Sequence, residues 1–127
     1  MTRPKTLTKD DLVRFVRGEK PWRMLLSHGI FIEFIDRKVH AKSSGASPIS
    51  PETADVAAGF SRLERDRDAL REWAAVVLAL DRIDMGKLDA SPEGELLLEA
   101  LWDASFGEEV SAKTWSLVRR LAAKKRL

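Results

Sequence analysis

The chain has no cysteine, no tyrosine and only two histidines among its 127 residues. The absence of cysteine excludes disulfide bonds, thiolate metal sites and cysteine nucleophiles. It also fits a reducing compartment, so we expect a cytoplasmic protein. The longest uncharged apolar run, residues 73–80, is too short to cross a bilayer, and no apolar stretch follows the basic N-terminus as it would in a signal peptide. We therefore expect no membrane contact.

Motifs that carry catalysis are absent as well. The seven glycines stand apart, so there is no glycine-rich loop to hold a phosphate, and there is no Gly-x-Ser-x-Gly turn for a serine nucleophile. No combination of residues forms a recognisable active site. We expect a protein that is not an enzyme and that needs no cofactor.

What the chain does have is charge sorted by position. Residues 1–50 carry a net charge of +5, residues 51–110 a net charge of −9, and residues 111–127 a net charge of +6. The overall charge of +2 hides this acidic centre between basic ends. Such sorting indicates either a surface for a charged partner or basic ends that dock onto the acidic middle.

The length and the apolar share of 44% predict one globular domain over residues 1–127. We expect an α+β fold that is mostly α. In this prediction residues 1–42 form two short helices and a small β-hairpin, residues 43–50 form a loop, and residues 51–127 form a bundle of three to four helices.

Helix starts carry most of the local signal. Thr8 with Asp11 three residues later predicts a capping box. Ser50 and Ser91 are each followed by Pro-Glu, which favours a helix start at both serines, and Ser111 is a further cap. The charged stretch 63–68 leaves open whether residues 51–80 form one bent helix or two.

The best strand is Ile30–Ile35, which is β-branched and aromatic and alternates its faces. Residues 38–42 form its expected hairpin partner. An apolar strand at a free sheet edge is a template for pairing with another chain. A homodimer through the 30–35 strand is therefore a further expectation.

One group of residues has metal-ligand side chains: His28, Glu33, Asp36 and His40. In a hairpin Glu33 and His40 would face each other across the strands, and imidazole with carboxylate suits zinc or iron. The spacing matches no established metal motif. A solvated strand face explains the same residues, so we expect no metal site.

The acidic middle of the chain predicts a binding surface. We expect a non-catalytic protein-binding module of immunity, inhibitor or adaptor type, in the general style of small bacterial accessory proteins. Its acidic helical surface would engage a basic partner, since complementary charge speeds association. The residues expected to form this surface are Asp66, Asp68, Glu95, Glu99 and Trp102. Of the four tryptophans, Trp102 is the one we expect to be exposed, while the others flank the core.

The alternative is a nucleic-acid-associated regulator that uses the basic ends. The C-terminal segment supplies Lys113, Arg119, Arg120, Lys124, Lys125 and Arg126 as phosphate contacts. Cations at the end of a helix also complement the helix dipole, which explains the same residues without a ligand. The acidic middle would repel nucleic acid unless it lies on another face of the molecule.

Overall fold

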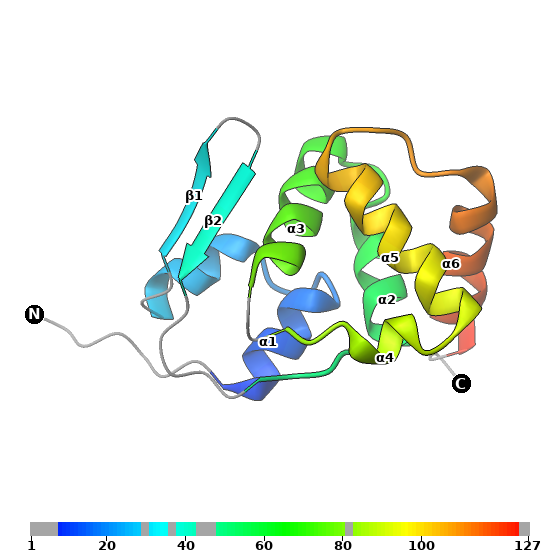
Figure 1. Cartoon of the computed structure of the whole chain (residues 1–127), viewed down its shortest axis with the longest axis horizontal. Coiled ribbons are helices and arrows are strands. Elements are labelled where there is room, and N and C mark those ends of the chain that lie inside the picture. Colours follow the sequence, from blue (N-terminus) through cyan, green and yellow to red (C-terminus); the bar gives the residue numbers. More distant parts are fainter. Residues whose placement is uncertain (1–7, 29–30, 36–37, 43–47, 81–82, 125–127) are drawn as a thin grey trace, which may run out of the picture.

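The computed structural model describes residues 8–28, 31–35, 38–42, 48–80 and 83–124. Helices dominate these residues (Figure 1). In chain order the elements are helix α1 (Lys9–Val16), the 3-10 helix η1 (Trp22–His28), strands β1 (Phe31–Ile35) and β2 (Lys38–Lys42), and helices α2 (Thr53–Leu63), α3 (Arg67–Ala79), α4 (Gly86–Asp89), α5 (Pro92–Ser105) and α6 (Ala112–Lys124). No helix in this described part of the chain combines the length and the apolar character needed to span a bilayer.

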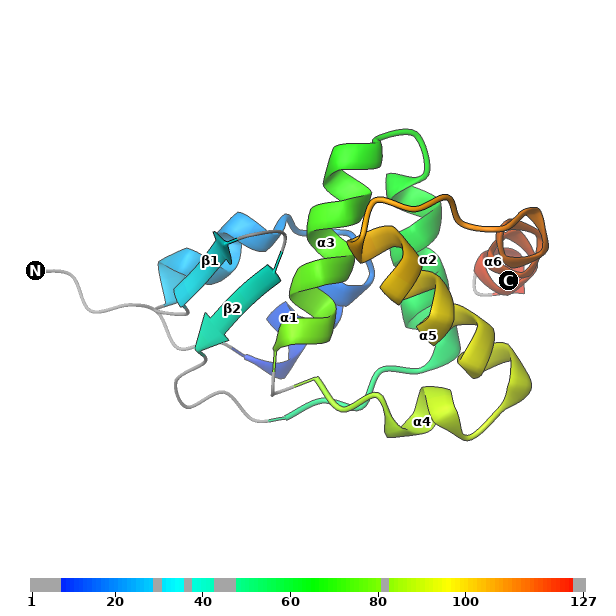
Figure 2. The ribbon, with the colours of Figure 1, turned by 45° about the horizontal axis from the view of Figure 1, so that its top comes forward.

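The predicted α+β class is wrong, because the molecule is built as a helical bundle. Helix α3 packs against α5, α2 packs against α6, and α4 packs across the start of α5 (Figure 2). The N-terminal part contributes to the core of the bundle. Helix α1 packs on α2 and buries Leu12, Phe15 and Val16 in the same apolar cluster as the later helices.

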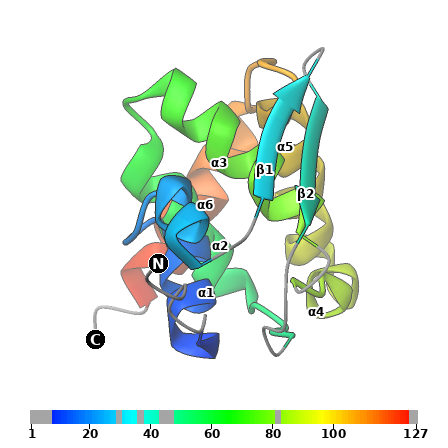
Figure 3. The ribbon, with the colours of Figure 1, turned by 90° about the vertical axis from the view of Figure 1, so that its left-hand side faces the viewer.

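The two strands are short and flank the bundle. They pair antiparallel, with Phe31 opposite Lys42 and Glu33 opposite His40. Strand β2 lies along α3, and β1 contacts η1 (Figure 3). Ile32 is buried in the apolar cluster of the bundle. The second edge of β1 pairs with no other strand within the described residues.

Local capping signals set three of the helix starts as predicted. The Thr8 hydroxyl accepts a hydrogen bond from the Asp11 amide, and the Asp11 carboxylate accepts one from the Thr8 amide. Ser91 accepts from the Gly94 amide at 3.0 Å. Ser111 accepts from the Thr114 amide at 3.2 Å. In each case the hydroxyl satisfies a backbone donor that the helix itself leaves free.

The predicted cap at Ser50 is wrong, since α2 begins two residues later with Glu52 at the N-cap. A long-range contact explains the shift. Ile49 forms a parallel bridge with Ile83, and its carbonyl accepts a hydrogen bond from the Asp84 amide at 2.8 Å. This pairing holds the chain extended just before Pro51, so the helix starts only after it.

Residues 51–80 form two helices, which answers the question that the sequence left open. Helix α2 ends at Leu63, and Asp66 starts α3 by accepting a hydrogen bond from the Ala69 amide at 3.0 Å. The charged stretch between the helices is therefore a turn, which allows α3 to fold back beside α2.

An aromatic cluster joins the helices in the core. The ring of Phe60 contacts Trp73 edge-on at 5.1 Å and Trp115 edge-on at 5.9 Å between centroids. Such edge-to-face pairs add to the stabilisation from area burial alone. Gly59 makes this packing possible, because a Cβ there would overlap the Trp73 ring and the Val16 carbonyl.

Candidate protein-binding surface

Helix α5 carries an exposed stripe along its outer face. Glu95, Glu99, Trp102 and Phe106 are all exposed, and their spacing of four, three and four residues places them on one side of the helix. The opposite side buries Leu97 and other apolar residues in the core. The structure thus places three of the predicted binding residues in one row and adds Phe106, which the sequence analysis missed. We call these four residues the α5 stripe.

The two aromatic residues of the α5 stripe lie against each other. Trp102 is 50% exposed and Phe106 is 59% exposed, and their rings stack with centroids 6.3 Å apart. The prediction that Trp102 is the exposed tryptophan is confirmed, because Trp73 is buried and Trp22 and Trp115 are half-buried. Large aromatic rings at the surface in contact with each other are typical of interaction sites.

The segment of the chain that contains the α5 stripe is acidic. Between Lys87 and Lys113 the chain contains seven Asp and Glu residues and no Lys, Arg or His. In the described part of the chain, neither Glu95 nor Glu99 forms an ion pair. No described cation neutralises these two carboxylates, which leaves them available to a partner.

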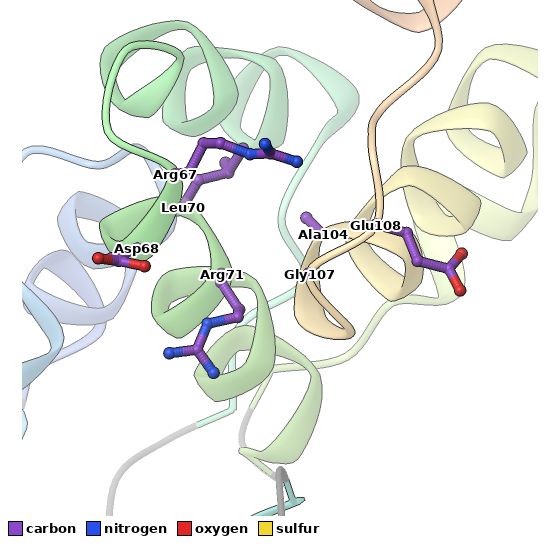
Figure 4. Close-up of a pocket in the computed structure, with 7 residues that line it drawn as sticks. All are labelled: Arg67, Asp68, Leu70, Arg71, Ala104, Gly107 and Glu108. Atoms are coloured by element: carbon purple, nitrogen blue, oxygen red, sulfur yellow. The ribbon is translucent and has the colours of Figure 1, made fainter.

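The other two predicted acidic residues do not belong to the α5 stripe. Asp66 and Asp68 lie at the start of α3, and the Asp66 carboxylate is occupied as the N-cap of that helix. Asp68 is exposed beside a hollow between α3 and the end of α5 (Figure 4). The row that the structure brings together therefore consists of α5 residues alone.

Two of the basic residues predicted to bind nucleic acid contact acidic residues of the same chain. Arg119 binds Glu64 at 3.0 Å, and Arg120 lies 3.5 Å from Glu93. Lys113 is exposed and forms no ion pair within the described residues. The side chain of Lys124 is not among those described, and Lys125 and Arg126 lie outside the described residues.

The N-terminal basic segment meets the acidic middle in the same way. Arg17 lies 3.8 Å from Asp55, and Arg23 lies 3.9 Å from Glu72. Together with the α6 pairs, these contacts show that the basic ends dock onto the acidic middle, one of the two readings of the charge sorting. The α5 stripe is the acidic surface that this docking leaves uncovered.

The structure describes the predicted metal-ligand residues only in part. Glu33 stands opposite His40 in the strand register and His28 ends η1, while Asp36 lies outside the described residues. Across the residues that the structure describes, no group of three or more His, Cys, Asp or Glu side chains is placed to hold a metal ion.

A second surface feature was missed by the sequence analysis. A hollow of about 380 Å³ lies between the first turns of α3 and the end of α5 (Figure 4). Arg67 and Arg71 line it from α3, and Ala104 and Gly107 line it from the α5 side. Its parts come from residues more than 30 positions apart, so no local pattern indicated it.

Comparisons with protein-family models, with curated proteins and with solved structures find no significant match to this chain.

Proposed function

We propose that this protein is a non-catalytic protein-binding module of immunity, inhibitor or adaptor type, which engages a basic partner through the α5 stripe. The observation that carries the proposal is the stacked, exposed pair Trp102 and Phe106 in line with the unpaired carboxylates of Glu95 and Glu99. A cytoplasmic location belongs to the same proposal, on the absence of cysteine.

The α5 stripe has the composition of an interface. Tryptophan is enriched among the residues that dominate binding energy, because burying its large ring removes much apolar surface from water and orders few rotatable bonds. Carboxylates around such a centre stay partly hydrated and contribute chiefly to the rate and specificity of association. The aromatic pair would thus supply affinity, and Glu95 and Glu99 would select a positively charged partner.

The chemistry of the partner follows from this arrangement. Arginine suits it best, since a guanidinium group can pair with a carboxylate and stack on an aromatic face. The chain itself shows such a contact, with the Arg23 guanidinium 4.9 Å from the centre of the Trp22 ring. We expect a partner surface that carries arginines beside an apolar spot.

The experiment begins by isolating the partner with the wild-type protein and purifying both components. Association and dissociation rates are then measured at several salt concentrations. Trp102→Ala and Phe106→Ala should mainly speed dissociation, with an affinity loss of about tenfold or more for a central aromatic residue. Glu95→Lys with Glu99→Lys should slow association and flatten its dependence on salt.

The matched control is Asp89→Lys, which reverses an exposed acidic charge on α4 that is not part of the α5 stripe. Asp66 is unsuitable for this test because its substitution would uncap α3. Unchanged rate constants in the α5 variants, or an equal effect of Asp89→Lys, would contradict the proposal.

The strand edge supports a separate proposal of self-association. A second copy pairing along β1 would use the edge that no strand covers within the described residues. Ile32→Pro removes one backbone donor and should produce a lighter species in sedimentation. A wild-type protein that already sediments as a monomer at high concentration would contradict the homodimer.

A further inference from the structure

Two arginines that form no ion pair within the described residues line a hollow between α3 and the end of α5. Arg67 and Arg71 are four residues apart on α3, so they lie on the same side of the helix. The wall opposite them is formed by Ala104 and Gly107, which have almost no side chain to fill the space (Figure 4). The result is a hollow of about 380 Å³ that both arginines line; the Arg67 guanidinium extends toward Ala104, and the Arg71 guanidinium points away from α5 (Figure 4).

The lack of partners sets these arginines apart from most others in the chain. In the described part of the chain, six arginines form ion pairs with acidic residues: Arg14, Arg17, Arg23, Arg62, Arg119 and Arg120. Arg67 and Arg71 form none there, although Arg71 is partly buried. A partly buried charge without a partner is costly, so a bound anion would stabilise it.

Two carboxylates stand at the rim of this hollow, those of Asp68 and Glu108. Figure 4 shows Asp68 pointing away from α5 and Glu108 pointing outward from the far side, while Arg67 extends into the space between the elements. The Asp66 carboxylate already caps the helix. The arginine side chains, and not the helix end, therefore provide the positive charge.

We propose that this hollow binds a small ligand through an oxyanion, a phosphate or a carboxylate, held by Arg67 and Arg71. Guanidinium groups match both oxyanions, because their paired N–H donors meet two oxygens at once. The hollow has the volume of a small-molecule site. Gly107 has a φ of +77°, a backbone conformation that favours glycine, and it lies beside the Arg71 side chain.

The test is a titration of the isotope-labelled full chain, followed by NMR, with inorganic phosphate and separately with succinate at constant ionic strength. We expect saturable shifts of the backbone amides from Arg67 to Arg71 and of Gly107. Saturation by one anion alone assigns the oxyanion to that class, and saturation by both supports the shared chemistry. Absence of saturable shifts with either anion would overturn the proposal.

Variants make the test specific. Arg67→Gln and Arg71→Gln should each weaken binding about tenfold, as expected for the loss of one charge-assisted contact. The matched control is Arg65→Gln, which removes the same charge from an exposed residue that does not line the hollow. An equal loss in the control, or unchanged affinity in the Arg67 and Arg71 variants, would show general charge attraction and overturn the site.

Two further variants, one at the edge of the hollow and one in the α5 stripe, extend the test. Asp68→Asn should tighten anion binding, because it removes a negative charge from the rim. Trp102→Ala should leave anion binding unchanged, since that residue does not line the hollow. Failure of the oxyanion site and failure of the α5 stripe are thus distinguishable.

Discussion

The indole N–H of Trp73 donates a hydrogen bond to the backbone carbonyl of Phe15 at 3.1 Å, and both groups are buried. The two residues are 58 positions apart in the sequence. Phe15 lies in the last turn of α1, and its carbonyl also accepts a hydrogen bond from the Gly18 amide at 3.0 Å. The bond from Trp73 ties the first helix of the chain to the centre of the bundle.

Replacing Trp73 with Phe should therefore destabilise the protein. The smaller ring leaves part of the indole space empty, and the Phe15 carbonyl keeps only its bond from the Gly18 amide, so we expect a loss of about 1–3 kcal/mol in the free energy of unfolding. Urea denaturation measures it. Trp102→Phe is the control and should be close to neutral, because Trp102 is exposed. Equal stability of the two variants would contradict the role of the hydrogen bond.

Gly94 should not tolerate a side chain. It lies in the first turn of α5, and a Cβ there would overlap the backbone of Leu88 in α4. The clash is with backbone, which cannot rotate away, so Gly94→Ala should cost about 1–3 kcal/mol and separate α4 from α5. At Gly86 the nearest atoms belong to the exposed side chain of Asp84, and Gly86→Ala should cost much less. Thermal unfolding of the two variants checks the difference.

Stability should fall in acid through Asp11. The hydrogen bond from Lys20, together with the bonds from Thr8, lowers the pKa of Asp11 from 3.8 to about 2. Because the folded-state pKa is the lower one, the contribution is fully present above the unfolded value and is lost as the pH falls from about 4 towards 2. Its size is about 1 kcal/mol, as for a helix cap at a partly exposed site.

Asp11→Asn should lower stability at neutral pH and show a smaller further loss in that acid window. Denaturation curves measured from pH 5 to pH 2 compare it with the wild type. Asp10→Asn removes a neighbouring exposed carboxylate that pairs only with Arg14, and it serves as the control. A wild-type and an Asp11→Asn protein with parallel pH dependence would contradict the assignment.

The docking of α6 should depend weakly on charge. Arg119 and Glu64 form a 3.0 Å ion pair between α6 and the end of α2, with Arg119 largely exposed. A double-mutant cycle with alanine at both positions should give a coupling of about 0.2–1 kcal/mol that shrinks as salt is added. The same cycle between Lys113 and Glu64 should give none. A coupling independent of salt would show that packing, and not charge, joins these residues.

Local sequence signals predicted the features that depend on neighbours within one helical turn. Thr8, Ser91 and Ser111 cap their helices because each needs only a donor three residues away. The helical periodicity of α5 likewise turns Leu97 and Leu101 inward and Trp102, the expected exposed tryptophan, outward. These features depend on contacts within one helix and not on which other elements pack against it.

Tertiary packing decided the rest. The Ile49–Ile83 bridge replaced the predicted cap at Ser50, and the Trp73–Phe15 bond joins α1 to the bundle. The hollow beside Arg67 and Arg71 exists only because the end of α5 lies across the first turns of α3. The physical reason is the same in each case. Contacts between distant residues depend on how the apolar faces of whole helices pack together, and a short stretch of sequence does not predict this packing.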